Sequence, residues 1–401
     1  MANNNENKVL NVPHLRFPEF SGEWYKHSLG EIGETIVGLT YKPSDVVENN
    51  GIIVFRSSNI KDGAIDYSDL VRVNKNIKKR IITKEDDILV CARNGSQRLI
   101  GKNAIIKNKD TNNTFGAFMM AYRSKYNLFI LPLLSTKRYF SQVAENLGAR
   151  INQITASDFN RFEFYVPNDY IERAKIAELF RLLDERITVQ NKIIEKLETL
   201  IKGIVDFIFT YYKFTTIPFK DVYSCAGEGG TPATSNPEYY KSGTIPFIKI
   251  DDLQNKYIES NKDYITELGL QKSSAWIVPT NSIIYSNGAT IGKVSINKYP
   301  VCTKQGILGI APKANMNVEF LYYFMTSTMF AKAIERVVTE GTMRTAYLKD
   351  INHILCPIPN SNEQNKIAKL LSALSAKLEN EIIFQRKLQK QKEFLLSQMF
   401  I

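Results

Sequence analysis

Two long segments of the chain carry apolar residues at steps of three and four, which is the spacing of a coiled-coil seam. Residues 171–208 contain no proline, and Gly203 is the one helix-weakening residue among them. Residues 362–399 contain neither proline nor glycine. Because a Pro-Asn pair precedes each segment, we predict two long helices that begin just after Asn168 and Asn360.

The apolar seams of the two predicted helices share one register. At about 1.5 Å per residue, each helix spans on the order of 55 Å. Since both seams lie in one chain, the pattern favours packing of one helix against the other as an extended rod; a helical hairpin buried in a single core is the alternative. The first seam comprises Ile176, Leu179, Leu183, Ile187, Gln190, Ile194, Leu197, Ile201, Ile204 and Ile208, and the second comprises Ile367, Leu370, Leu374, Leu378, Glu381, Gln385, Leu388, Lys392, Leu395 and Met399.

The sequence outside these helices has the composition of mixed α+β domains. It is rich in glycine, proline, tyrosine, asparagine and β-branched residues, and turn residues bound its short apolar runs. Such runs predict β-strands, of which Ile52–Phe55, Ile88–Cys91, Ile283–Tyr285 and Ile307–Ile310 are examples. A helical apolar pattern also occurs at Val318–Met329.

The chain repeats itself with a period near 192 residues. Six matches follow in the same order in both halves, which is improbable by chance. We therefore predict two copies of one unit, and the length of 401 residues fits two or three domains. The matches are Gly38-Leu39-Thr40 with Gly229-Gly230-Thr231, residues 51–55 with 243–247, Asn94-Gly95 and 100–102 with Asn287-Gly288 and 291–293, Gly148 with Gly341, 166–168 with 358–360, and 175–177 with 366–368.

Positive charge is concentrated in the first half of the chain. The formal net charge of +11 favours a polyanionic partner. Residues 51–150 hold 18 Lys and Arg against 8 Asp and Glu. This clustering indicates a phosphate-contacting surface, although a solvated side chain is the alternative for any one residue. The cluster comprises Lys75, Lys78, Lys79, Arg80, Lys84, Arg93, Arg98 and Lys102.

The composition argues against several other classes of protein. Cys91, Cys225, Cys302 and Cys356 are far apart, so we expect neither a disulfide framework nor a Cys-rich zinc site. Three histidines are too few for a His-rich metal centre. No run of about 18 apolar residues occurs, so we expect no membrane partner. Residues 1–11 lack the apolar stretch of a secretory signal, which makes the cytoplasm the simplest compartment.

Motifs that resemble enzyme signatures are present but incomplete. Residues 236–239 resemble the N-P-P-[YF] motif of amino-methyltransferases, except that glutamate stands in the third position. Residues 288–294 resemble a P-loop, but one residue is missing between the glycines and valine replaces the final Ser or Thr. The adjacent carboxylates Asp86 and Asp87 would point apart on a strand. We therefore expect no catalytic centre in this chain.

The duplication and the order of the motifs resemble the specificity subunit of type I restriction-modification systems, over nearly the whole chain. The first copy departs from the pattern, since Leu39-Thr40-Tyr41 lacks the proline and Glu172-Arg173 replaces Glu-Gln. The segments that carry the resemblance are 12–20 with Trp24 for the N-terminus; 229–232, 239–240, 243–247 and 287–293 for the recognition domains; and 356–359, 363–364 and 366–368 for the entry to the helices.

This resemblance implies two tandem target recognition domains of mixed α/β structure, each followed by a long conserved helix. The two helices would form an antiparallel coiled coil and give the chain pseudo-twofold symmetry. Each recognition domain would read one half of a bipartite site in double-stranded DNA, and the helices would set the spacing. The implied bounds are 1–21 for an N-terminal extension, 22–166 for the first recognition domain, 167–212 for the central spacer helix, 213–358 for the second recognition domain, and 359–401 for the C-terminal spacer helix.

The resemblance also implies partners that carry the chemistry, so that this subunit is not itself an enzyme. The helices would dock two modification subunits, which bind S-adenosylmethionine and methylate adenine N6. Restriction subunits that use ATP and Mg²⁺ would join this core, and no cofactor or metal is expected in this chain. A stand-alone two-headed DNA-binding protein and an unrecognised DNA enzyme are the two alternatives.

Candidate DNA contacts follow from side-chain chemistry. Arg and Lys suit phosphate or guanine, whereas Asn and Gln suit adenine. A solvated side chain or a local turn hydrogen bond is the alternative for each. The candidates are Lys42, Arg56, Lys78, Lys79, Arg80, Arg93, Asn94, Arg98 and Lys102 in the first unit, and Lys249, Asn287, Lys293, Lys304, Gln305 and Arg344 in the second.

Overall fold

The computed structural model divides the chain into two compact units. The first unit holds the chain up to Gln190 together with Phe384–Ile401, and the second holds Asn191–Ile383. The predicted match of Gly148 with Gly341 lies outside the described residues. Those described residues fall in four ranges: 11–61, 63–147, 152–339 and 344–401.

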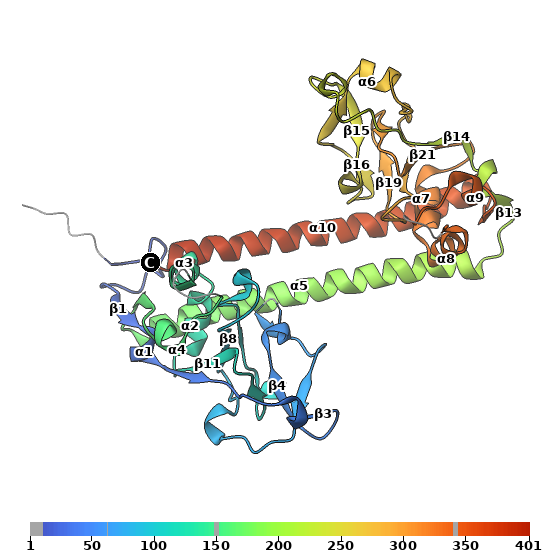
Figure 1. The fold of residues 1–401 in the computed structure, drawn as a ribbon. Helices are drawn as coiled ribbons and strands as arrows, with labels where there is room; N and C mark the ends of the chain where they lie inside the picture. The colour runs from blue at the N-terminus through green and yellow to red at the C-terminus, as the bar shows by residue number, and fades with distance from the viewer. Residues whose placement is uncertain (1–10, 62, 148–151, 340–343) are drawn as a thin grey trace, which may run out of the picture. The chain divides into compact units, whose positions relative to one another are not determined.

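Both long helices are confirmed, and Figure 1 shows each as one continuous element. Helix α5 (Tyr170–Tyr211) has 42 residues, and helix α10 (Ser361–Met399) has 39. Every predicted seam position of α5 is buried or half-buried. In α10 the prediction fails at Leu370, which is 53% exposed, while Leu371 is fully buried. The buried face at the start of α10 is therefore offset by one residue from the predicted seam.

The first unit is built on two four-stranded sheets. One has the order β2-β11-β8-β9 and is antiparallel, and the other has the order β10-β4-β7-β3, in which β10 and β4 are parallel. The predicted strands Ile52–Phe55 and Ile88–Cys91 are confirmed as β4 and β8. The other bounds are β1 Tyr25–Ser28, α1 Leu29–Ile32, β2 Glu34–Val37, β3 Val46–Val47, β5 Ile60–Lys61, β6 Ala64–Ile65, β7 Val71–Val73, β9 Asn103–Ile105, β10 Thr114–Phe115, β11 Met119–Arg123, α2 Asn127–Leu133, α3 Lys137–Leu147, α4 Ala156–Asn160 and β12 Glu163–Val166.

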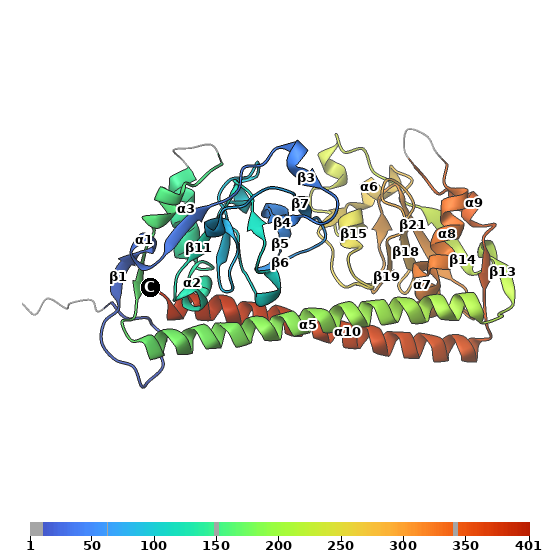
Figure 2. The same cartoon turned by 90° about the horizontal axis from the view of Figure 1, so that it is seen from below.

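The second unit is built on a five-stranded sheet of order β14-β21-β18-β19-β16 and a three-stranded sheet of order β17-β15-β20 (Figure 2). Strands β18 (Ile283–Ser286) and β21 (Ile307–Pro312) confirm the two strands predicted there. The other bounds are β13 Thr216–Pro218, β14 Tyr223–Glu228, β15 Ile245–Ile248, β16 Tyr257–Ile258, β17 Asp263–Ile265, α6 Glu267–Gln271, β19 Val294–Asn297, β20 Cys302–Thr303, α7 Val318–Thr326, α8 Thr328–Val337, α9 Leu348–Ile351 and β22 Leu355–Pro357.

The helical pattern at Val318–Met329 is confirmed, but it belongs to two helices, because the chain is interrupted between α7 and α8 at Ser327. Ser327 is extended, with ψ at 152°, and its Oγ accepts a hydrogen bond from the amide of Phe330 at 3.2 Å. A serine in this position is a favourable N-cap, so it starts a new helix rather than continuing the old one.

Each unit closes its own apolar core with parts of both long helices. In the first unit, Phe180 of α5 and Met399 of α10 join the cluster around Trp24. In the second unit, Phe209 of α5 packs on α7, with its ring centroid 5.4 Å from that of Phe320. Burial of such large apolar side chains fixes each helix segment to its unit, since each contributes about 1.5–3 kcal/mol.

A buried ion pair ties the N-terminal segment of the first unit to α5. Arg16 Nε lies 2.7 Å from Glu172 Oε1, and the indole Nε1 of Trp24 donates to the same oxygen at 3.2 Å. The side chain of Glu172 is 1% exposed. The hydrogen bond to Glu172 is the main cause of a raised pKa at Arg16. The segment whose motif resembles a family N-terminus therefore anchors the start of the helix.

Within the first unit, the segments of α5 and α10 run in opposite directions. Lys392 Nζ lies 2.5 Å from Asp184 Oδ1, and the guanidinium of Arg186 lies 5.3 Å from the ring centroid of Phe384. Residue numbers therefore rise along one helix as they fall along the other. Leu183, Ile187 and Leu388 form the buried cluster between these segments.

Candidate nucleic-acid interface

Arg56 and Lys249 occupy the same position in their respective units. The amide of Arg56, just after β4, donates to Asn59 Oδ1 at 2.9 Å. The amide of Lys249, just after β15, donates to Asp252 Oδ2 at 2.8 Å. Both predicted DNA contacts are half-buried and sit on the same kind of turn. Each also makes an ion pair with an aspartate at 2.8 Å, Arg56 with Asp69 and Lys249 with Asp263.

Lys102 and Lys293 form a second matched pair of cations. Each follows a glycine in the left-handed region, Gly101 with φ at 81° and Gly292 with φ at 103°. Glycine adopts this conformation without steric cost, which explains why both copies keep it. The glycine amides donate to the last residue of the preceding strand, Gly101 to Cys91 O at 2.9 Å and Gly292 to Ser286 O at 3.0 Å.

The predicted match of Asn94-Gly95 with Asn287-Gly288 is wrong. The amides of Asn287 and Gly288 both donate to the carbonyl of Gly306, at 3.0 and 3.2 Å. In the first unit, the amides of Ala92 and Arg93 donate in the same way to the carbonyl of Phe118, at 2.9 and 3.0 Å. The first unit therefore carries a longer loop before its glycine, and the Asn-Gly pair lies inside it. Asn-Gly is a common turn dipeptide, so a match of these two letters was weak evidence of equivalence.

The predicted contacts on this longer loop differ in how free their side chains are. Arg93 and Arg98 are exposed. The guanidinium of Arg93 lies 5.1 Å from the ring centroid of Phe118, which is 59% exposed. Asn94 is half-buried, donating from Nδ2 to Ser57 Oγ at 2.8 Å and accepting at Oδ1 from the amide of Ser96 at 3.0 Å. Asn94 therefore holds the loop, whereas Arg93 presents its charge to solvent.

In the second unit, the structure separates buried from exposed candidates. Asn287 is fully buried and donates from Nδ2 to the carbonyl of Ala346 at 3.1 Å. We therefore assign it to holding the loop and leave it out of the proposed DNA contacts. Lys304 and Gln305 are exposed on the turn between β20 and β21. Arg344 is also exposed and pairs with Glu335 at 3.0 Å.

Lys78, Lys79 and Arg80 are exposed on a turn at the other end of β8 from Arg93. Arg123 links this turn to Asp87, which lies directly before the start of β8. Arg93 lies after the end of the same strand. The structure therefore divides the predicted basic residues of this unit between two places. Lys42 is exposed as well, on a separate turn where its amide donates to Asp45 Oδ2 at 2.8 Å.

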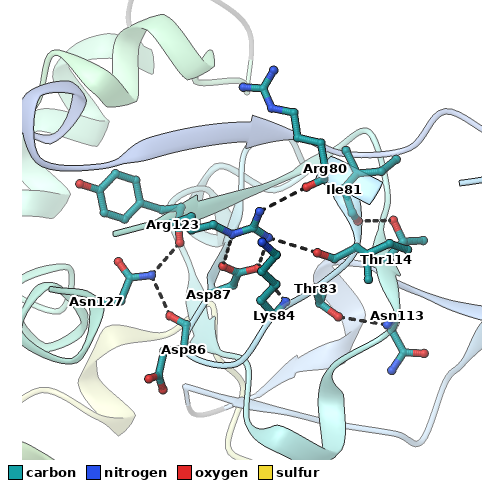
Figure 3. A network of polar contacts seen from close by, with 12 residues as sticks. Arg80, Ile81, Thr83, Lys84, Asp86, Asp87, Asn113, Thr114, Arg123 and Asn127 are labelled. Atoms are coloured by element: carbon teal, nitrogen blue, oxygen red, sulfur yellow. Dashed lines mark hydrogen bonds and ion pairs between the residues drawn. The ribbon is translucent and has the colours of Figure 1, made fainter. Parts of the chain in front are cut away.

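A buried carboxylate and an arginine fix the turn that carries these three cations (Figure 3). Arg123 donates from Nε and Nη2 to the two oxygens of Asp87, at 2.7 and 2.6 Å. Its Nη2 also donates to the carbonyl of Ile82 at 3.1 Å, and its Nη1 to that of Arg80 at 3.5 Å. The hydrogen bond to Asp87 is the main cause of a raised pKa at Arg123. The outward side chains of the turn therefore rest on a rigid backbone.

Three residues that shape the candidate interface could hardly be recognised from the sequence. Phe118 is an aromatic residue in a short Gly-Ala-Phe turn, where exposure cannot be inferred from the pattern. Arg123 looks like one more member of the basic block, although it is a structural partner of Asp87. Glu228 ends β14 and accepts at Oε1 from the amide of Gly306 at 3.1 Å. The pairing of each with its neighbour depends on contacts between distant segments.

Two other kinds of feature, a membrane-spanning helix and a metal site, were sought among the described residues. Among the helices that the structure describes, none combines the length and apolar character needed to cross a membrane. In the same part of the chain, no group of three or more His, Cys, Asp and Glu residues is arranged to hold a metal ion.

The two units repeat one scaffold, and each carries exposed basic residues on its loops. The family model for the type I restriction modification DNA specificity domain matches residues 21–199 and, a second time, residues 212–385. The chain belongs to this family, and the DNA specificity domain occurs in it twice.

Individual relatives agree with the family match. The type I restriction enzyme MjaIX specificity subunit of Methanocaldococcus jannaschii is 38% identical over 168 residues, which are 40% of this chain and 38% of that protein. The EcoR124I/EcoR124II specificity subunit of Escherichia coli is 27% identical over 210 residues, which are 49% of this chain and 50% of that protein. These alignments span half or less of either relative.

A solved structure extends the similarity of fold to nearly the whole chain. The S subunit of a type I restriction-modification system from M. genitalium superposes with a TM-score of 0.62 at 17% identity. The superposition covers 97% of this chain and 99% of that one. The fold is therefore shared across both units.

Proposed function

We propose that each unit reads one half of a bipartite site in double-stranded DNA. The observation that supports this most strongly is the duplicated scaffold, in which the same backbone hydrogen bonds carry different exposed side chains in the two units. Two copies of a binding module in one chain combine their affinities when the spacing of the sites fits the spacing of the modules. The recognition domains span residues 22–166 and 213–358 in this proposal.

The helices form an antiparallel coiled coil that spaces the two recognition domains and gives the chain pseudo-twofold symmetry. The spacer consists of residues 167–212 and 359–401. The opposed helix segments of the first unit and the half-buried seam of α5 support this arrangement. Of the proposed N-terminal extension, 1–21, the described residues 11–21 are tied to the start of α5 by Arg16.

The helices also dock two modification subunits, and restriction subunits join the resulting complex. Along α5, Ile193, Leu200, Phe207 and Tyr211 are 39 to 72% exposed and follow one another at steps of seven, seven and four. That spacing places them in one stripe, and an exposed apolar stripe is typical of a surface that binds protein. The methyltransferase and nuclease chemistry, with its S-adenosylmethionine, ATP and Mg²⁺, belongs to those partners in the cytoplasm, and this chain is not an enzyme.

The DNA-facing set combines phosphate contacts with base contacts. Half or more of the hydrogen bonds in protein–DNA interfaces go to the backbone, so most of the exposed cations should contact phosphate. The proposed set is Lys42, Arg56, Lys78, Lys79, Arg80, Arg93, Arg98 and Lys102 in the first unit, and Lys249, Lys293, Lys304, Gln305 and Arg344 in the second; Asn94 supports the loop.

Sequencing of adenine methylation tests the function. In a host without other adenine methyltransferases, we expect a bipartite methylated motif only when this chain and its modification subunits are expressed together. The purified chain alone should transfer no labelled methyl group from S-adenosylmethionine, because the partner carries the chemistry. Robust transfer by the chain alone, or an undivided motif in the complex, would contradict the proposal.

Charge reversal at Lys78 and Lys79 should weaken DNA binding regardless of sequence. If both contact phosphate, the double variant Lys78→Glu/Lys79→Glu should lower affinity and reduce the slope of log K against log salt by about two. Fluorescence anisotropy across a salt series measures both quantities. The matched control reverses the exposed lysines Lys220 and Lys332, which lie in the second unit. An equal loss in the control would assign the effect to net charge, and an unchanged slope would place the two lysines off the DNA.

A further inference from the structure

We propose that one junction in each unit is its base-reading site, with Arg93 selecting guanine in the first unit and Gln305 selecting adenine in the second. The junction is the point where the loop after β8, or after β18, meets the turn before β11, or before β21. This inference rests on the proposed function that each unit reads one half-site, and it assigns the residues that choose the bases.

The two junctions have the same backbone. In each, two consecutive amides converge on one carbonyl, that of Phe118 or of Gly306, at 2.9 to 3.2 Å. The first residue of each amide pair is also held in the same way through its carbonyl. That of Ala92 accepts from the amide of Ile154, and that of Asn287 accepts from the amide of Ala346, both at 2.9 Å. A scaffold that is repeated while its side chains change is suited to reading two different sequences.

The matched cations behave differently from the junction residues. Arg56 and Lys249 are both positive, as are Lys102 and Lys293, so these two positions keep their charge in both units. Contacts to phosphate carry no sequence information and can stay the same, whereas contacts to base edges must differ between half-sites. At the junctions the side chains do change, because Gly288 stands where the first unit has Arg93, and Gln305 stands where the first unit has Ala117. This difference points to base recognition.

In the first unit, the guanidinium of Arg93 is oriented by an aromatic ring and is free to donate to the edge of a base. Its guanidinium lies on the ring of Phe118, and no hydrogen bond or ion pair of that group occurs within the described residues. A hollow of about 360 Å³ opens beside it, lined by Ser57, Asn94, Gly95 and Asn152 as well. An arginine stacked on an aromatic ring keeps its planar fork oriented, and that fork matches O6 and N7 of guanine.

In the second unit, bare backbone replaces the aromatic ring. Gly288 and Gly306 approach so closely that a Cβ on Gly288 would lie 3.2 Å from the Cα of Gly306. The neighbouring Gln305 is exposed, and its side chain makes no hydrogen bond within the part of the chain that the structure describes. Its backbone is fixed on both sides, because its amide donates to Thr231 Oγ1 at 3.3 Å and the next amide donates to Glu228.

This arrangement suits adenine. A glutamine amide can donate to N7 and accept from the N6 amino group of adenine in the major groove. The fixed backbone of Gln305 lowers the entropy lost when the side chain engages a base. The glycines beside it leave room for the edge of a base pair to approach the turn.

Methylation sequencing of the whole complex with Arg93→Ala and Gln305→Ala tests the assignment. With Arg93→Ala, one position in one half of the motif should lose its preference for guanine by about 5- to 150-fold, while the other half stays unchanged. With Gln305→Ala, one adenine position should relax to a similar degree in the opposite half. Arg93→Lys keeps the charge but loses the planar fork, so it should relax the same guanine position with near-normal affinity for nonspecific DNA.

Two control variants resemble the tested residues but lie away from the junctions. Arg138 also sits over an aromatic ring, 5.6 Å from the centroid of Tyr165, and Gln271 is an exposed glutamine at the end of α6. Arg138→Ala and Gln271→Ala should leave the motif intact. Folded variants at Arg93 and Gln305 that keep every position of the wild-type motif would overturn the assignment. A wild-type complex without a bipartite motif would instead refute the proposed function.

Discussion

Four residues inserted into each long helix will lengthen the gap between the two half-sites by one to two base pairs and leave both half-site sequences unchanged. Four helical residues add about 6 Å, and a base-pair step is about 3.4 Å. An insertion of four is a stutter, which a coiled coil absorbs by local unwinding. The insertions belong after Gln190 in α5 and after Ile383 in α10, because the boundary between the two units falls there in each helix.

The measurement is the methylated motif of the variant complex. A control of unchanged length carries alanine at Asn191, Lys192, Glu195 and Lys196, which are exposed on α5. It should methylate the original motif with the original gap. If the lengthened variant folds, assembles and still methylates at the original gap, the helices do not set the spacing. Loss of folding in the lengthened variant, with an intact control, would favour a helical hairpin buried in one core.

The elements predicted well from the sequence are those whose own apolar spacing matches the helix or strand they form. Helix α5 keeps its seam from Ile176 to Ile208 because each position lies on one face of one regular helix. Strands β4 and β8 are continuous apolar runs, and burial on both faces of such a run leaves little ambiguity. The break at Ser327 was missed because an N-cap serine inside an apolar pattern looks like one polar position of a continuing helix.

The candidate site was predictable only in part, since its geometry depends on contacts between distant segments. The pairing of Lys102 with Lys293 followed from the sequence because each directly follows a glycine that the turn requires. The equivalence of Arg93 with Gly288 did not, because the two loops differ in length and the letters Asn-Gly align misleadingly. The burial of Asn287 depends on a carbonyl 59 residues away, which no local pattern reports.

Replacement of Arg123 by methionine will destabilise the first unit by about 3 kcal/mol. Asp87 is 1% exposed, and Arg123 supplies its charge partner through two hydrogen bonds. Removal of one partner of a buried ion pair leaves the other charge uncompensated and costs roughly 3–5 kcal/mol, and the 22% exposure of Arg123 places our estimate at the lower end. The carbonyls of Arg80 and Ile82 lose their donor in the same step.

Denaturant unfolding followed by the fluorescence of Trp24 measures this loss. Trp24 is buried in the first unit, and Trp276 lies in the second, so a Trp276→Phe background makes the signal specific to the first unit. Arg80→Met is the matched control, because its pair with Glu34 is exposed and should contribute at most about 1 kcal/mol. In the double variant Asp87→Asn/Arg123→Met, the stranded charge is gone, so much of the lost stability should return. If the double variant is as unstable as Arg123→Met alone, the uncompensated carboxylate is not the cause, and the lost carbonyl contacts of the turn account for the effect.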